Sequence, residues 1–578
     1  MPAKAGAGMT MRMELSPITL EILATSKLIF AATIIVLFIL IVKRVRRPLY
    51  YSGVLAISLA AFVITILTPQ TTMFWGNNGD ELYVAANMTQ MVAGDTSSDF
   101  YYANLPPFYP PLYFWTVGFL AKPFATNGLA AYKIGVALSA LLLFLGTFFW
   151  FKLHDKKSHN RLVHPWLYFL IPLSFLTLLP FDEFILKPHE ALSALLSVIL
   201  VGAIGVQFQK DRWKLKHLLF YSISGAIILM TYYFWGILIA LSLGLLVFFP
   251  PRRFHNVMHL IFLGIFVLAF SSPYLVPLYQ SVQTHGIDLA QGTYFSIHDI
   301  LTFAPWAEFS LRGLLSLIGL IGLILARKKR FFGSVLILFV ISYAYQFFGL
   351  FQFVKDATPL LPSKPFLYLA RACLAVGLGH VLLETYHYLS FRYGRNAQIS
   401  VAAVGVIVLG SLSPFVEMID RPGIIDRINQ NTLVPKEFIL SEAVKTHVPD
   451  YADRTWLAPT RPEINTYLPL KYYISHNEHY SHFAAGFSDR LETLTSITST
   501  STPQAFFEAT QQLDPPADSL LLFYDETTDS YPLNFWIDNY PNGGTSHRID
   551  LDPTLITDEY WSKMYDLWDW RIYTAVIP

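Results

Sequence analysis

The sequence predicts a polytopic α-helical membrane protein, a helical bundle of about 12 transmembrane helices followed by an extracytoplasmic α/β domain. Of its 578 residues, 54% are hydrophobic and only 14% are charged, whereas soluble domains carry about 25% charged residues. Several apolar runs are long enough to cross the hydrocarbon core of a bilayer as helices. After Glu417 the hydropathy falls and stays low to the end of the chain. We therefore expect a membrane domain over residues 1–418 and a soluble domain over 419–578.

Twelve apolar segments, separated by Pro, Gly or charged residues, are the candidate spans. They lie near residues 17–42, 49–69, 126–151, 163–180, 190–208, 216–232, 234–250, 256–272, 309–326, 331–350, 366–390 and 398–418. Every second loop between these segments is basic, and the six basic loops together hold 20 Lys and Arg residues. Because Lys and Arg concentrate in cytoplasmic loops, this alternation fixes the predicted orientation. The loops at 70–125, 181–189 and 273–307, and the whole C-terminal domain, are then extracytoplasmic.

Charge and cysteine content narrow the function classes. Residues 419–578 hold 11 Lys and Arg against 23 Asp and Glu, a net charge of −12, and residues 1–418 carry +13. The chain thus has a basic membrane part and an acidic soluble part. Cys373 is the only cysteine and lies in an apolar run, which excludes an intramolecular disulfide and a CxxC site.

The first predicted outer loop carries two adjacent carboxylates, Asp80 and Glu81, within "WGNNGDELYVAANMTQM" at 75–91. An acidic pair at a helix N-terminus is favourable to the helix dipole, which is a purely structural role. A carboxylate at the membrane boundary could instead act as a general base toward a hydroxyl. Burial and the neighbouring like charge would then raise one pKa of the pair. The residues alone leave both interpretations open.

The same loop continues with "NLPPFYPPLYFW" at 104–115, in which four prolines alternate with aromatic residues that include Tyr109 and Tyr113. Proline stiffens the backbone, so this motif predicts an extended turn followed by an amphipathic segment on the membrane surface. An interfacial aromatic belt without chemistry is the alternative.

A second acidic pair, Asp182 and Glu183, occurs one outer loop later in "FDEFILKPHE" at 181–190, which also holds Lys187 and His189. Carboxylates from two outer loops, one of them with a cation, would suit a charged, lipid-linked substrate. Ordinary surface charge in a tight loop is the other interpretation.

Cations are scarce on this predicted face, so each is a candidate phosphate ligand: Lys187, Lys355, Lys364 and Arg371. Arg371 lies about one turn inside a predicted span, where charge is costly and marks function. Snorkelling of its guanidinium to the headgroups is the alternative.

The soluble domain alternates predicted helices and strands, which favours an α/β fold. Helices are expected at 434–447 and 503–513, and strands at 454–459, 518–525 and 570–577. A loop at 474–490 contains an HxxHxxH spacing formed by His476, His479 and His482. Because the intervening residues are poor helix formers, a metal site is disfavoured there. We expect this loop to fold back toward the membrane site.

Taken together, "NNGDELY", "LPPFYPPLYFW", the many spans and the tail segment "HYSHFAAGFSDR" resemble GT-C fold glycosyltransferases that use polyprenyl-phosphate sugars. Within that class they look most like the galactan 5-O-arabinofuranosyltransferases of the arabinofuranosyltransferase A family. The resemblance implies a plasma-membrane enzyme, a decaprenyl-phospho-arabinofuranose donor and the galactan of cell-wall arabinogalactan as acceptor. It also implies that Asp80 and Glu81 are catalytic.

The resulting hypothesis is an inverting displacement in which Asp80 deprotonates the acceptor hydroxyl and Glu81 orients the acceptor or the base. Lys187 and Arg371 would bind the donor phosphate. The residues expected to bind substrate are Asn78, Tyr109, Tyr113, Asp182, Glu183, His189 and His482. No metal ligand is predicted, although the four loop carboxylates could hold a divalent cation loosely. A GT-C transferase of a mannosyl, glucosyl or aminoarabinose type, or a polyprenyl-sugar transporter, remains an alternative, and nucleic acid is not an expected partner.

Overall fold

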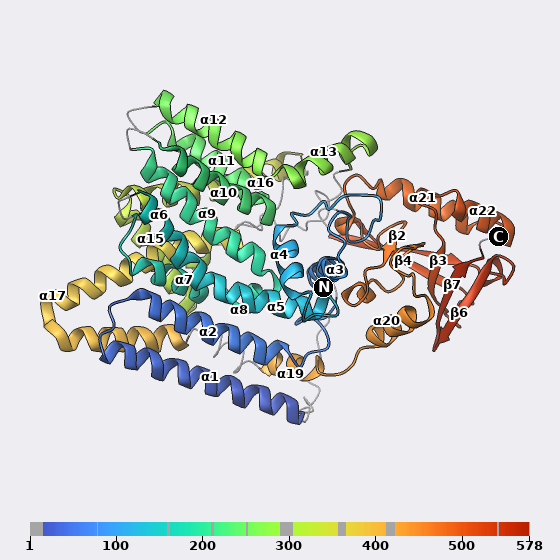
Figure 1. The fold of residues 1–578 in the computed structure, drawn as a ribbon, viewed down its shortest axis with the longest axis horizontal. Helices are drawn as coiled ribbons and strands as arrows, with labels where there is room; N and C mark the ends of the chain where they lie inside the picture. The colour runs from blue at the N-terminus through green and yellow to red at the C-terminus, as the bar shows by residue number, and fades with distance from the viewer. Residues whose placement is uncertain are drawn as a thin grey trace.

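The computed structural model describes residues 15–77, 79–158, 162–209, 213–249, 253–288, 304–356, 366–411, 422–539 and 543–576. A bundle of apolar helices forms one end of the molecule and a domain that contains a β-sheet forms the other (Figure 1). Helix α3 (Gly79–Ala93) lies between the two, where the membrane part meets the C-terminal domain.

The bundle follows the predicted apolar segments closely. Its helices are α1 (Pro17–Val42), α2 (Pro48–Leu67), α5 (Gly128–Leu141) with η1 (Leu142–Gly146) and α6 (Thr147–Ser158), α7 (Leu167–Leu178), α8 (Phe181–Leu186), α9 (Pro188–Gln207), α10 (Leu215–Thr231), α11 (Phe234–Leu246), α12 (Arg253–Phe270), α13 (Ser272–His285), α15 (Leu311–Ala326), α16 (Arg330–Asp356), η4 (Phe366–Ala370) and α17 (Arg371–Ser411). Helix α9 is the most buried of the long apolar helices, so it forms the centre of the bundle.

The predicted number of twelve spans is not confirmed. Within the described ranges, five helices are long and apolar enough to cross a membrane, or six if α12 and α13, which meet at a 78° bend, count as one broken span. Five further apolar helices are shorter. The predicted spans at 366–390 and 398–418 both fall in the helical element α17, which packs against α7 and α15 and also against α1. Its ribbon turns back on itself at the far end of the bundle, so that it forms two arms (Figure 1).

The first predicted outer loop is largely folded. It contains α3 and α4 (Leu112–Ala121), and the Pro-aromatic stretch before α4 is not helical. Gly128, at the start of α5, lets α3 and α5 touch, since a Cβ there would lie 2.1 Å from Thr89 Oγ1. The predicted extended turn is confirmed, and the loop proves to be a packed layer at the end of the bundle.

The C-terminal domain is a mixed α/β unit, as predicted. Its five-stranded sheet has the order β2 (Lys471–Tyr472), β1 (Thr455–Trp456), β3 (Ser519–Phe523), β7 (Trp570–Ala575) and β6 (Trp561–Leu567). Strand β1 is parallel to β2 and β3, and β7 is antiparallel to β3 and β6. A separate hairpin joins β4 (Tyr531–Asp538) and β5 (Gly544–Leu551). The helices are α19 (Pro422–Gln430), α20 (Lys436–His447), α21 (Phe487–Thr498) and α22 (Pro503–Gln511).

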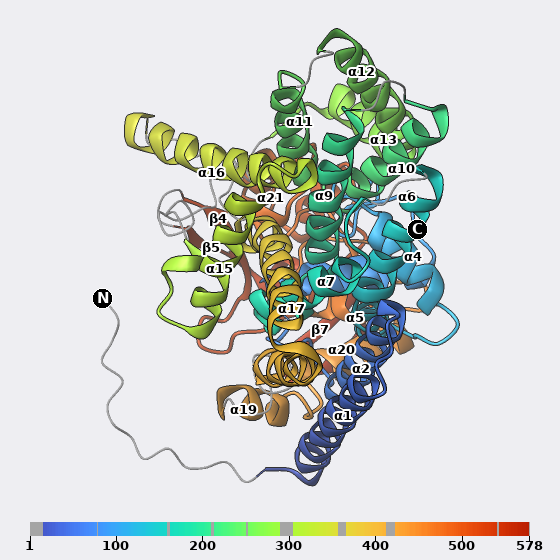
Figure 2. The ribbon, with the colours of Figure 1, turned by 90° about the vertical axis from the view of Figure 1, so that its left-hand side faces the viewer.

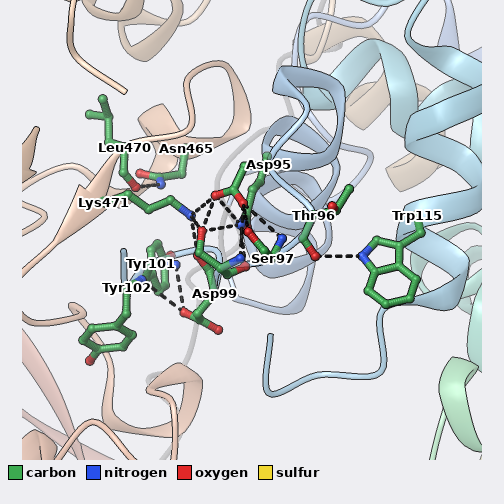
Figure 3. Close-up of polar contacts among 12 residues, drawn as sticks. Asp95, Thr96, Ser97, Asp99, Tyr101, Tyr102, Trp115, Asn465, Leu470 and Lys471 are labelled. Atoms are coloured by element: carbon green, nitrogen blue, oxygen red, sulfur yellow. Dashed lines mark hydrogen bonds and ion pairs between the residues drawn. The ribbon is translucent and has the colours of Figure 1, made fainter. Parts of the chain in front are cut away.

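Several contacts join this domain to the membrane part, and two of them lie at the edges of the junction. Helix α19 lies beside α1 at the edge of the bundle (Figures 1 and 2). Lys471 of β2 reaches the loop after α3, where its ammonium lies 3.2 Å from Asp95 Oδ2 and donates to Ser98 Oγ at 2.9 Å and to the Asp99 carbonyl (Figure 3). Lys471 is 5% exposed, so this cation and its partners form a buried tie between the two parts.

Removing the Lys471 ammonium should loosen this junction. Breaking a fully buried ion pair by removing one partner costs about 3–5 kcal/mol, because the remaining charge is left uncompensated. The Asp95 side chain is 34% exposed, so water compensates part of its charge and the cost here is smaller. We expect Lys471→Met to lower the midpoint of thermal unfolding in detergent and to speed proteolysis between the membrane part and the C-terminal domain. Lys445→Met is the matched control, since Lys445 is exposed and lies 3.9 Å from Glu442. Equal unfolding midpoints for both variants would contradict the tie.

Candidate active site

Four side chains from three distant parts of the chain meet at the start of α3. Lys187 Nζ lies 2.8 Å from Asp80 Oδ2 and 3.4 Å from Glu190 Oε1. Tyr480 of the C-terminal domain donates its hydroxyl to Asp80 Oδ1 at 3.1 Å. The Asp80 side chain is 28% exposed, whereas that of Glu190 is 2% exposed. Asp80 is therefore the carboxylate of this cluster that a substrate can reach.

Local sequence explains why these charges converge. Asp80 lies in the first turn of α3 and Glu190 in the first turn of α9, where a carboxylate is favourable to the helix dipole. Lys187 precedes α9, and Pro188 begins that helix, a position at which proline is preorganised. Two helix N-termini thus present carboxylates to one lysine.

The Lys187 ammonium is charged in this site. Burial disfavours its charge, but the adjacent carboxylates of Asp80 and Glu190 outweigh burial and raise the pKa of Lys187. An ammonium has three N–H donors, and two carboxylates occupy two of them. Among the described residues, Asp80 and Glu190 are its two carboxylate partners, so one N–H is left over from this pairing.

Glu81, the other member of the first acidic pair, points elsewhere. It is 2% exposed, and the Trp75 N–H donates to both of its carboxyl oxygens, at 2.9 and 2.7 Å. Successive residues of a helix point about 100° apart, which separates Glu81 from the Asp80 side. Burial raises the pKa of Glu81 to about 8, against the lowering effects of the Trp75 N–H and of Arg427. Its described contacts shape the loop before α3.

The Pro-aromatic motif supplies one wall of the site. The Tyr109 hydroxyl lies 3.3 Å from His189 Nε2 and 3.5 Å from Glu190 Oε1. The Tyr113 ring is 5.2 Å from the His189 ring, and the Tyr113 hydroxyl contacts Ser139 Oγ at 3.2 Å. Tyr109 and His189 thus lie beside the charged cluster, as the substrate-binding prediction requires, and Tyr113 lies behind His189.

The second acidic pair is in the adjacent α8 and faces a separate cation. The Tyr368 hydroxyl donates to Glu183 Oε2 at 3.3 Å. Burial and Asp182 raise the pKa of Glu183, and the charges of Lys187 and Arg371 oppose this shift. Oδ1 of Asp182 is buried and has no hydrogen-bond partner among the described residues. Arg371 is 4% exposed, which places its charge inside the protein.

His482 and Asn78 are the remaining residues predicted to bind substrate. His482 lies in the tail loop, where its Nδ1 accepts the Ala484 N–H at 2.9 Å and its ring packs 5.6 Å from that of Phe108. It therefore ties the tail to the Pro-aromatic motif. Asn78 lies outside the described residues.

The C-terminal domain also braces the loop that leads into Asp80. Arg427 donates to the Trp75 carbonyl at 3.1 Å and lies 5.4 Å from the Trp75 ring. The buried Asn431 amide donates to the Gln70 side chain and to the carbonyls of Met73 and Phe74. The direction of the loop thus depends on residues more than 350 positions away.

No group of three or more His, Cys, Asp or Glu in the described ranges is arranged to hold a metal ion.

Sequence reasoning missed three residues of the site: Glu190, Tyr480 and Tyr368. Glu190 had a detectable signal, because it follows Lys187 by three residues at a proline-initiated helix start, and residues three apart on a helix are neighbours. The only sequence signal for Tyr480 was its position within a His-rich loop. No sequence signal marked Tyr368, because apolar spans routinely contain tyrosine.

The sequence of residues 16–411 matches the family Arabinofuranosyltransferase N terminal. The chain belongs to this family. It is therefore a multi-pass membrane glycosyltransferase of the arabinofuranosyltransferase type, which agrees with the family predicted from its motifs. The matched range contains Asp80, Lys187, Glu190 and Arg371 and ends before Tyr480.

Comparison with curated protein sequences gives no match. Among solved structures, ArnT from Cupriavidus metallidurans bound to undecaprenyl phosphate has 14% identity and a TM-score of 0.49, over 91% of this chain and 98% of that one. The oligosaccharyltransferase AglB from Archaeoglobus fulgidus, in complex with an inhibitory peptide and a dolichol-phosphate, has 12% identity and a TM-score of 0.46, over 87% of this chain and 74% of that one. These likenesses are too remote to define residue roles.

The protonation of Glu81 gives a pH-dependent prediction. Because the folded state binds this proton more tightly than the unfolded state, Glu81 favours folding most below its ordinary pKa of 4.5 and progressively less as the pH rises to about 8. Glu81→Gln keeps an acceptor for the Trp75 N–H and has no proton to lose. We expect its thermal unfolding midpoint to rise relative to that of the native protein between about pH 5 and about pH 9. Parallel pH profiles in detergent would contradict the buried neutral carboxyl.

Proposed function

We propose that this protein transfers arabinofuranose from a polyprenyl-phosphate donor to a hydroxyl of cell-wall galactan at the extracytoplasmic face of the plasma membrane. The observation that carries the proposal is the partly exposed Asp80 carboxylate, held between Lys187 and Tyr480. The family supports the sugar, and the apolar bundle beside the site suits a lipid-linked donor.

Asp80 acts as the general base. As the acceptor oxygen forms its bond to the anomeric carbon, the hydroxyl proton passes to Asp80 and the bond from that carbon to the phosphate oxygen breaks. The electron pair of that bond leaves with polyprenyl phosphate. Attack opposite the leaving group inverts the anomeric configuration.

The leaving phosphate gains negative charge, and nearby cations stabilise that charge. Lys187 has one N–H beyond those directed at Asp80 and Glu190. Arg371, buried near Glu183, is the second candidate. The donor phosphate then lies on the bundle side of Asp80 and the acceptor on the opposite side.

The remaining residues orient these groups. Tyr480 fixes one oxygen of Asp80 through its hydroxyl, and Glu81 holds the loop before α3 through Trp75. Tyr109 and His189 line the donor side together. Asp182 and Glu183 lie near the same cations and orient substrate hydroxyls.

Replacing Asp80 by Asn tests the base. General-base catalysis contributes about 10²–10⁴ in rate, so we expect Asp80→Asn to lower kcat at least about 100-fold while donor binding persists. The assay measures transfer of label from radiolabelled polyprenyl-phospho-arabinose to a short galactan by the purified protein. Asp489→Asn is the control, because Asp489 is an exposed carboxylate in the first turn of α21. Near-normal turnover of Asp80→Asn would exclude Asp80 as the base.

The same assay identifies the sugar. Polyprenyl-phospho-mannose, -glucose and -aminoarabinose donors are compared with the arabinose donor under equal conditions. If the protein consumes one of these donors in place of the arabinose donor, arabinofuranose is not the transferred sugar, but the protein is still a polyprenyl-phosphate-dependent glycosyltransferase. Movement of donor across a vesicle membrane without any transfer would instead indicate a transporter.

A further inference from the structure

The hairpin of β4 and β5 presents an aromatic surface on the C-terminal domain. Trp536 is 39% exposed. Its indole lies over Gly544 of β5, since a Cβ on Gly544 would be 2.2 Å from Trp536 Nε1 and 2.6 Å from its Cε2. The glycine therefore lets the ring lie against the neighbouring strand. An exposed ring supported in this way offers a preformed stacking surface.

A carboxyl group accompanies the ring on the same face. Asp538 follows Trp536 by two residues on β4, so both side chains point to one side of the strand. Both carboxyl oxygens of Asp538 are buried, and neither has a hydrogen-bond partner among the described residues. The Asp538 N–H donates to Glu478 Oε2 at 2.7 Å, and burial together with Glu478 raises the pKa of Asp538 to about 8. An exposed ring thus lies beside a buried carboxyl whose hydrogen-bonding capacity the described residues leave unused.

Charge selects the class of ligand. Burial is the main cause of the raised pKa of Glu478, and the charge of Asp288 raises it further. The charges of Glu478 and Asp288 disfavour an anionic ligand such as the donor phosphate, and the raised pKa of Asp538 keeps its carboxyl largely neutral near pH 7. A neutral polyol has hydroxyl donors for carboxyl oxygens and weakly positive C–H groups for the negative face of an indole. A neutral glycan therefore fits this surface.

The hairpin is joined to the candidate active site through the short 3₁₀ helix η6 (Glu478–Tyr480). The backbone N–H of Trp536 donates to the His476 carbonyl at 2.8 Å, two residues before η6 begins. The helix ends at Tyr480, whose hydroxyl contacts Asp80. Two residues of 3₁₀ helix rise only about 4 Å, so a short run of backbone separates the hairpin from the residue that binds Asp80.

We propose that Trp536, Asp538 and Glu478 form a subsite for the acceptor glycan, a few sugar units from the hydroxyl that Asp80 deprotonates. The inference rests on the proposed function and adds the direction in which the acceptor lies. The acceptor chain runs over the C-terminal domain, on the side of Asp80 opposite to the donor.

Acceptor length provides the test. A galactofuranose disaccharide is too short to reach Trp536, and an octasaccharide reaches it. We expect Trp536→Ala to raise KM for the octasaccharide about five- to tenfold, with kcat and the disaccharide KM unchanged. Trp536→Phe should restore most of the octasaccharide KM, because it keeps a ring. Trp568→Ala is the matched control, since Trp568 is an exposed tryptophan of the same domain away from this hairpin.

Equal KM changes for the two acceptors, or none for either, would overturn the subsite. Binding of a fluorescent octasaccharide without donor separates this inference from the proposed function. If the native protein transfers no arabinose but binds the octasaccharide more tightly than Trp536→Ala does, the subsite stands and the proposed reaction fails. If transfer occurs and both proteins bind equally, the reaction stands and the subsite fails.

Discussion

One ammonium group holds the candidate active site together. Lys187 lies between Asp80 of α3 and Glu190 of α9, and α9 is the most buried of the long helices. Without this cation, two carboxylates would face each other at the ends of two helices, one of them almost fully buried. Their repulsion and desolvation would separate the outer layer from the bundle. The charge that suits a donor phosphate is therefore also the charge that assembles the site.

The C-terminal domain forms part of this site. Tyr480 reaches Asp80 directly, Arg427 contacts the loop before α3, and Lys471 holds the loop after it. Helix α3 is thus fixed at both ends by residues that lie beyond the family match. The bundle supplies the lysine, and the C-terminal domain fixes the carboxylate. Under the proposed function, the bundle faces the lipid-linked donor and the domain faces the acceptor. Such a division suits a reaction between a lipid-linked donor and a water-soluble glycan.

Sequence patterns predicted most of the helices and strands that depend on the properties of neighbouring residues in the chain. Apolar length placed the bundle helices within a few residues, because hydrocarbon thickness sets the length of a span. In the tail, the helices at 434–447 and 503–513 and the strands at 518–525 and 570–577 are confirmed with small boundary changes. The hairpin of β4 and β5 was missed, since its exposed face reads as polar and aromatic loop.

The sequence by itself determined the membrane class, the soluble α/β domain, the family motifs and the outer-loop charges, because hydropathy, periodicity and residue type are local properties. The tertiary structure alone decided which charges meet. It separated Asp80 from Glu81, although they are neighbours in sequence, by directing one toward Lys187 and the other toward Trp75. It also brought Tyr480 across 400 residues to Asp80. Such contacts depend on the packing of whole elements, and local composition does not encode that packing.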